Sequence, residues 1–303
     1  MESLAGSPQN FARVVSLDAA GHLVAPGETG DSFMRRMALW RSNLDSLETS
    51  MATREGFELW PGLQLKNSDR IPKEILEEAA SCTESLYGFK IDWVPGFFLS
   101  KGLGLLWGGC AISLSPPSGA SLFLVRSAFA KKEKWFIYGR KELLAHELCH
   151  VAREALQDLA MEEHFAYQTS LSRFRRYIGN CFRSEIDAYL FVVPVFILLG
   201  VQLCNLLLEW SIPAWPFWLL ALLPPAWLLT RNQLQRVRYF KAERALSALG
   251  CPFPKAVLFR CLSKEVDELS KLSGDALKAR LKLKSETELR WAVIAARFLS
   301  GIT

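Results

Sequence analysis

Between residues 188 and 230 the chain carries a single charged side chain, Glu209. The two uncharged runs that flank it, 188–208 and 210–230, each have about the 20 residues that a helix needs to cross the hydrocarbon core of a bilayer. Tryptophan prefers the interface between lipid and water. The second run contains Trp210, Trp215, Trp218 and Trp227. These features predict a transmembrane hairpin of two helices over residues 188–230.

Basic residues flank the predicted hairpin on both sides. They are Arg173, Arg175, Arg176 and Arg183 before it, and Arg231, Arg236, Arg238, Lys241 and Arg244 after it. Because Lys and Arg gather on the cytoplasmic side of membrane proteins, we expect both termini to face the cytoplasm and Glu209 to lie at the far turn. Two alternatives stay open: a hairpin that enters the bilayer without crossing it, since Pro224 and Pro225 shorten the second run, and an apolar core hairpin of a soluble protein.

The net charge of +5 is unevenly distributed along the chain. Residues 231–303 contain 15 Lys and Arg against 7 Asp and Glu, a balance of +8, which leaves −2 for residues 1–187 once Glu209 is counted. A basic segment directly after an almost uncharged block favours a membrane surface over a nucleic acid as partner. The seven cysteines lack a C-x-x-C pair, which is typical of reduced thiols in a reducing compartment.

Turn residues and apolar periodicity divide the remainder into an α+β region and helical segments. Residues 1–30, rich in Gly, Ser and Pro, read as a loose tail, and residues 31–187 as an α+β domain. In that domain we expect an amphipathic helix over 31–53, a helix that begins at Pro72, and strands between about 90 and 138. Two of these strands, 110–115 and 120–129, are separated by a turn over residues 116–119. Residues 231–303 predict a basic helical region, with helices over 231–250, 254–272 and 286–299, the last capped by Ser285 and Glu288.

The sharpest motif is the HExxH sequence of His146, Glu147 and His150, in a helical pattern that begins after Gly139. Positions i and i+4 of a helix lie on one face about a turn apart, so two imidazoles can hold one Zn²⁺. Glu147 lies close enough to accept a proton from a water on that metal, whose pKa the metal lowers towards about 7. These residues predict a zinc site with His146 and His150 as ligands and Glu147 as the general base.

A catalytic zinc site needs a third protein ligand. The nearest acids are Glu162 and Glu163, but an unbroken helix would place Glu163 about 20 Å from His150. Ligation therefore requires a break between about 153 and 161, where Asp158 is the one plausible N-cap. Glu162 and Glu163 could instead be charges that favour a helix N-terminus. His164 is a further candidate, as ligand or transition-state donor, and Tyr167 and Tyr177 could also stabilise an oxyanion.

With these residues the chain resembles the gluzincin zinc metallopeptidases. Within them it is similar to the membrane-embedded peptidases of the CaaX-prenyl-protease and heat-shock HtpX type, which combine HExxH with a downstream Glu in an E-x-x-A-D element. Glu163 and Ala166 match that element, and Tyr167 stands where the family has Asp. The resemblance implies a zincin-like catalytic domain over 31–187, with His146, His150 and Glu163 as zinc ligands and Glu147 as general base.

A competing alignment places the third ligand after the hairpin. Residues 240–250 are similar to the family's A-D-R-x-A-x-x-L-G segment, and the position that would hold the ligand Glu is Tyr239. In that alignment either Glu243 substitutes as the ligand or the site is degenerate. We prefer Glu163, with Glu162 and Glu243 as alternatives.

These observations lead to the hypothesis of a membrane-anchored zinc endopeptidase with a catalytic domain that faces the cytoplasm. Its expected partners are a protein or peptide substrate and the lipid bilayer, with no nucleic acid. The first alternative is a catalytically inactive membrane scaffold stabilised by zinc. The second is a membrane protein without a metal, in which the HExxH sequence is accidental.

Overall fold

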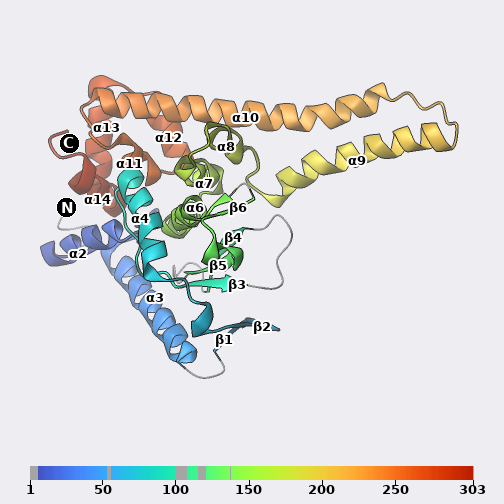
Figure 1. Ribbon diagram of the computed structural model, residues 1–303. Coiled ribbons are helices and arrows are strands. Elements are labelled where there is room, and N and C mark those ends of the chain that lie inside the picture. The colour runs from blue at the N-terminus through green and yellow to red at the C-terminus, as the bar shows by residue number, and fades with distance from the viewer. Residues whose placement is uncertain (1–5, 53–55, 100–107, 115–120, 137, 303) are drawn as a thin grey trace.

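The computed structural model of the protein describes residues 6–52, 56–99, 108–114, 121–136 and 138–302, and its fold is α+β with small sheets (Figure 1). Before the predicted membrane block, the longer helices are α2 (Pro8–Ala19), α3 (Gly30–Met51), α4 (Lys73–Tyr87), α6 (Arg140–Arg153) and α7 (Leu159–Ala166), with the short α5 (Ala128–Lys131) and α8 (Arg173–Ile178). The block itself falls in α9 (Glu185–Leu207) and the first half of α10 (Trp215–Ala248), and α11 (Pro254–Phe259), α12 (Ser263–Leu269), α13 (Gly274–Thr287) and α14 (Leu289–Phe298) follow it.

The largest sheet has three strands, β3 (Gly96–Leu99), β5 (Ser121–Arg126) and β4 (Gly109–Ser113), in that spatial order. β3 pairs parallel and β4 antiparallel with β5, so β4 lies at an edge. The antiparallel pairing of β4 with β5 confirms the expected strand pair, whereas the turn expected at 116–119 lies outside the described residues. Two hairpins complete the strands: β1 (Phe57–Trp60) with β2 (Leu63–Leu65), and β6 (Lys134–Trp135) with β7 (Tyr138–Gly139).

One apolar core joins the α6 region to the C-terminal helices. Leu144 and Leu148 of α6 belong to the same buried cluster as Leu246 of α10, Val257 of α11 and Trp291 of α14. α6 packs against α4, α7 and the edge strand β4. The helical pattern over 31–53 and the helix after Pro72 are also observed, as α3 and α4, and α4 stops at Gly88, where φ is +69°.

α9 and α10 extend away from this core side by side (Figure 1). Their connection is closed by Asn205, whose side chain exchanges two hydrogen bonds with the backbone of Ile212. Among the described residues, α9 is the one helix that is long and apolar enough to cross a membrane. α10 has an uncharged first half with Pro224 and Pro225 inside the helix, and it continues without a break into the basic segment after residue 230.

The N-terminal segment differs from expectation. The predicted loose tail over 1–30 contains helix α2, and His22 is buried between Trp40 and Trp93. Asp18 of α2 forms a buried ion pair with Arg260, far along the chain. Such a long-range partner is invisible in local composition, which is why the Gly, Ser and Pro content was misleading.

Two C-terminal helix boundaries also differ. The helix expected over 254–272 is divided into α11 and α12, because the backbone at Leu262 is extended and its N–H donates to the Glu265 carboxylate. The last helix begins at Leu289 rather than at 286, and Ser285 lies inside α13 instead of capping α14. The helical character of the region was predicted correctly, but its breaks were not.

Candidate metal centre

Helix α6 presents the HExxH residues from a helix whose other face is buried. Leu144, Ala145, Leu148 and Cys149 are fully or almost fully buried in the main core. His146 and His150, four positions apart, keep side-chain exposures of 16% and 22%. Packing therefore fixes α6, while the histidine face stays accessible to a small ligand.

The chain reverses direction directly after α6, as ligation by Glu163 requires. α6 ends at Arg153, a short 3₁₀ turn follows, and Gln157 takes a left-handed conformation with φ of +50°. Asp158 stands at the N-cap position of α7, yet its side chain makes no capping bond. It accepts hydrogen bonds from the Ser263 backbone and lies 3.6 Å from the Arg153 guanidinium.

The reversal brings Glu163 against both histidines. The two Nε2 atoms of His146 and His150 lie 3.1 Å apart. The Glu163 carboxylate lies 3.6 Å from His146 Nε2 and 3.5 Å from His150 Nε2. The three side chains thus form a group whose donor atoms could hold one metal ion.

The outer nitrogen of each ring has its own contact. Glu162 lies 3.5 Å from Nδ1 of His150, on the side away from the donor group. His146 forms a hydrogen bond with the backbone of Ala166, and its ring packs edge-on against Tyr167 at 4.7 Å between centroids. Such contacts fix ring orientation and tautomer in histidine metal sites.

Glu147 is buried and points towards the sheet. Its Oε2 accepts a hydrogen bond of 2.9 Å from the N–H of Ala111, on edge strand β4. The Ala111 amide is therefore directed away from β5 and towards α6. This bond ties the strand edge to the helix that bears the histidines.

Burial dominates the electrostatics of the group. It raises the pKa of Glu147 to about 7, although His150 and the Ala111 amide oppose the shift. It also raises the pKa of Glu163 and, helped by the neighbouring His150, lowers that of His146. For His150 burial is outweighed by Glu162, Glu147 and Glu163, which raise its pKa to about 9.

Cavities open on both sides of the donor group. One, of about 200 Å³, is lined by Gly109, Tyr138, His146, Glu147 and Tyr167 among others. The second, of about 400 Å³, is lined by Ala111, Ser113 and His150 together with Glu154 and Glu162. An extended ligand along β4 could therefore occupy space before and after the histidines.

The other residues singled out in the sequence do not belong to the donor group among the described residues. His164 is buried, packs against Tyr239, and lines neither cavity. Glu243, the alternative ligand, is half-buried and does not belong to the donor group found among the described residues. Tyr167 lines the smaller cavity, and burial raises its pKa to about 12, whereas Tyr177 packs under Arg236.

Two supporting residues were missed. Glu142, one turn before His146, accepts hydrogen bonds from Arg175 and the Leu171 backbone, at 2.9 Å each. These bonds hold the segment after α7 against the smaller cavity, which Glu142 and Arg175 both line. Glu142 is four residues before His146, and this spacing identifies it as a neighbour on the same helix face. Its partner Arg175 lies in a segment whose fold was not indicated by the sequence.

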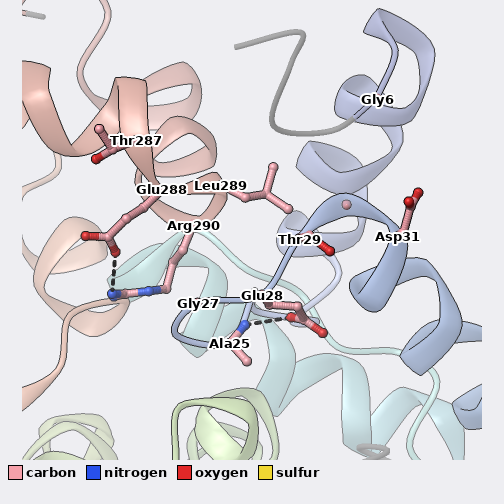
Figure 2. Close-up of a pocket in the computed structure, with 11 residues that line it drawn as sticks. Gly6, Ala25, Gly27, Glu28, Thr29, Asp31, Thr287, Glu288, Leu289 and Arg290 are labelled. Carbon is pink, nitrogen blue, oxygen red and sulfur yellow. Dashed lines mark hydrogen bonds and ion pairs between the residues drawn. The ribbon is translucent and has the colours of Figure 1, made fainter.

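A further cavity of about 290 Å³ lies between the start of α3 and the start of α14 (Figure 2). Two of its three acids are already engaged: Glu28 accepts from the Ala25 backbone and Arg36, and Glu288 lies 3.5 Å from Arg290. None of the metal-binding candidates lines it. We assign this cavity no part in the metal centre.

A comparison of the chain with known protein families, curated proteins and solved structures found no match in any of the three. The resemblance to gluzincin peptidases therefore stays a prediction from the motif. The functional argument rests on the geometry of the described residues.

Proposed function

We propose that the protein is a membrane-anchored zinc endopeptidase. The observation that carries the proposal is the convergence of His146 and His150 of α6 with Glu163 of α7 on one point. Glu147 lies on α6, next to His146. The observed fold is α+β. We propose in addition that the domain over residues 31–187 is zincin-like.

The spacing and chemistry of the donor atoms favour zinc. Ligand atoms in a tetrahedral site with bonds of about 2.0–2.1 Å lie about 3.3 Å apart. The two Nε2 atoms lie 3.1 Å apart, and different oxygens of Glu163 lie 3.6 Å from His146 and 3.5 Å from His150. Two imidazoles and one carboxylate, with a fourth position left for a substrate or water, form a set typical of catalytic zinc.

Peptide hydrolysis would follow from the groups around this point. A zinc ion held there supplies a Lewis acid that polarises the scissile carbonyl and acidifies a water. Glu147 accepts the proton of the attacking water and transfers it to the leaving amine, a task that suits a carboxyl with a pKa of about 7. We propose that Tyr167, which packs against His146 and lines the smaller cavity, donates a hydrogen bond to the developing oxyanion.

We place the substrate along β4, whose edge away from β5 faces α6 and bonds Glu147 through the Ala111 amide. An extended peptide can add to an exposed strand edge through main-chain hydrogen bonds. Because cavities lie on both sides of the histidines, a chain could continue in both directions from the bond that is cut. This arrangement favours cleavage within a chain over removal of a terminal residue.

Membrane attachment is proposed from the exposed apolar surface of α9 and α10. Within α9 the buried residues are Asp187, Pro194 and Leu198, and most of the remaining apolar side chains are exposed. Soluble proteins rarely expose so large a continuous apolar surface. We propose that α9, with the uncharged half of α10, lies in the bilayer as the predicted hairpin and that the remainder of the chain faces the cytoplasm.

Metal content tests the ligand assignment. We expect about one zinc per chain in the purified protein, and loss of zinc in His146→Ala and Glu163→Ala. Glu243→Ala is the matched control, since the competing alignment would make it the variant that loses zinc. Wild-type protein without zinc after purification in zinc-containing buffer would contradict the proposal.

The inactive scaffold is the second candidate, because the Glu147 carboxylate is already bonded to the Ala111 amide. If that bond is the sole role of Glu147, zinc removal will lower stability while the wild-type protein cleaves no peptide. Hydrolysis of a mixture of quenched fluorescent peptides, compared with Glu147→Gln, separates the two candidates.

A further inference from the structure

A cationic cavity lies where α10 passes α7 and α12. Its volume is about 410 Å³. Four of its lining residues are basic, and one is acidic, Asp267; the basic ones are Arg183, Arg231, Arg238 and Lys264. This cavity is separate from the two beside the histidines and shares no lining residue with them.

The positive charge of the cavity is only partly compensated. Arg231 is neutralised by a two-pronged ion pair with Asp187, with contacts of 3.0 and 2.7 Å. Arg238 pairs with Asp267 at 3.2 Å, but its side chain is 55% exposed, so water screens the pair.

Two cations form no side-chain ion pair among the described residues, although Asp187 lies near one of them, Arg183, and accepts a hydrogen bond from its backbone N–H. Arg183 donates to the carbonyl of Asn180 and the side-chain oxygen of Gln235, which are neutral, and no ion pair is found for it within the described part of the chain. Burial lowers its pKa to about 10, helped by the nearby Arg231 and opposed by Asp187 and Asp158. Lys264 is exposed at the rim and likewise forms no ion pair among the described residues.

The cavity spans the point where α10 changes character. Trp227, Arg231, Leu234 and Arg238 recur on one face of α10 at helical spacing. Trp227 belongs to the uncharged half and Arg238 to the basic half. If the proposed membrane attachment holds, this point lies at the level of the lipid headgroups.

We infer that this cavity binds a phosphate-bearing anion, with the headgroup of an anionic phospholipid as the expected source. Guanidinium groups bind phosphate oxygens through paired, charge-assisted hydrogen bonds, and an ammonium at the rim adds a point charge. Trp227, with 61% of its surface exposed, and the apolar surface beyond it would contact the acyl chains. The inference of a lipid source rests on the proposed membrane attachment, but not on the zinc site.

The test uses the full chain purified in detergent. Native mass spectrometry measures retention of dioleoyl phosphatidylglycerol against dioleoyl phosphatidylcholine, and a melting curve measures the effect of inorganic phosphate. The test variants are the double substitution Arg183→Gln with Lys264→Gln, and the single exposed substitution Lys264→Gln. The control, Lys278→Gln with Lys282→Gln, removes the same charge from exposed positions of α13 outside the cavity.

We expect phosphatidylglycerol to be retained in preference to phosphatidylcholine, and its affinity to fall roughly tenfold in the double variant and less in Lys264→Gln. The α13 control should match wild type. Stabilisation of the wild type, but not of the double variant, by inorganic phosphate without preference for phosphatidylglycerol would support the anion site and assign it to a free phosphate.

Three results would overturn the inference: equal retention of both lipids with no phosphate effect, equal behaviour of wild type and double variant, or an equal loss in the α13 control. Zinc content measured on the same samples keeps the proposals distinct, since absence of zinc would contradict the peptidase without affecting lipid retention. Failure of the protein to float with vesicles would contradict the membrane attachment.

Discussion

Two groups of carboxylates in the protein have pKa values that are shifted in opposite directions. In the C-terminal helices, Glu265 is surrounded by cations and hydrogen-bond donors, and its pKa falls to about 2. In the metal centre, Glu147 and Glu163 are buried beside histidines and a further acid, Glu162, and their pKa values rise, that of Glu147 to about 7.

The Glu265 group is complete within the chain. Arg290 donates two hydrogen bonds to the carboxylate, at 2.8 and 2.9 Å, and Lys284 donates one at 2.9 Å. The indole of Trp291 and the backbone of Leu262 donate two more. Every partner comes from α12, α13, α14 or the turn before α12, so this carboxylate joins the C-terminal helices to one another.

In the metal centre, the positive charge that faces Glu163 comes from the donor group itself, because the pKa of His150 is raised to about 9. Among the described residues, neither Lys nor Arg lies within ion-pair distance of Glu163. The two ion-pair contacts of Glu163 are with His146 and His150. Glu163 is partly buried and lies near a second acid, Glu162, and both effects raise its pKa, so its charged form is less well stabilised than that of Glu265. The contrast teaches that one group is satisfied by the fold, whereas the other would be satisfied by a divalent ion, which stabilises the deprotonated ligands.

The largest expected effect is on activity. Because Glu147 is the proposed proton acceptor, Glu147→Gln should lower peptide hydrolysis by about 10²- to 10⁴-fold. The amide keeps the size of the side chain and lies outside the ligand set, so zinc content should stay near that of wild type. Rates on quenched fluorescent peptides, with zinc measured on the same samples, check this prediction.

An active Glu147→Gln variant with full zinc would break the comparison, because the raised pKa of Glu147 would then serve no proton transfer. Glu265→Gln is the matched control. It makes the same chemical change in the internally satisfied group, and after correction for folded fraction its activity per zinc should equal that of wild type.

The next effect is on stability. Glu265→Ala leaves Arg290 and Lys284 buried without their anion, so it should lower the free energy of unfolding by about 3–5 kcal/mol. Glu163→Ala in zinc-free protein should cost less than 1 kcal/mol or stabilise, since it removes a poorly compensated acid. Urea unfolding in detergent checks both, and equal losses in the two variants would contradict the distinction drawn here.

A pH effect follows from the Glu265 group. Its pKa is lowered from 4.5 to about 2, because the hydrogen bonds and charge of Arg290, the Leu262 amide and Trp291 outweigh burial. The stabilisation from this group is therefore present above pH 4.5 and is lost as the pH falls towards 2, by about 3 kcal/mol at most. Urea midpoints of zinc-free protein between pH 2 and 7 should show this loss in wild type, and Glu265→Gln should lack that part of the slope.

The two histidines of the candidate metal centre were predictable because their arrangement depends on local helix geometry alone. One helical turn fixes the spacing of His146 and His150, and the need for a third ligand implied a reversal between about 153 and 161, where the structure has one. The form of this reversal was not predictable from residue types, since Gln157 rather than a glycine takes the left-handed position. The packing of α6 against the sheet, through Glu147 and Ala111, depends on a strand edge that periodicity alone does not orient.

The Glu265 group was not predicted, and the reason is sequence distance. Its side-chain donors lie 19 to 26 residues away, on two later helices. Asp18, which pairs with Arg260, is farther still from its partner. Helix periodicity identified most of the helices involved. It did not predict the turn at Leu262, whose N–H donates to Glu265, or the fold of the N-terminal segment, where Asp18 pairs with Arg260.

The smallest effect concerns Glu162, which separates ligand from support within the metal centre. Glu162 faces Nδ1 of His150, whereas Glu163 faces the Nε2 atoms of both histidines. Supporting groups of this kind typically contribute 10- to 100-fold to metal affinity. Glu162→Gln should therefore weaken zinc binding within that range, while Glu163→Gln abolishes stoichiometric binding. Competition with a fluorescent zinc chelator at pH 7.5 measures both, with Glu243→Gln as a control expected to change affinity less than about twofold. A larger loss in Glu243→Gln than in Glu163→Gln would move the third ligand to α10 and leave Glu163 as an uncompensated acid without a metal to explain it.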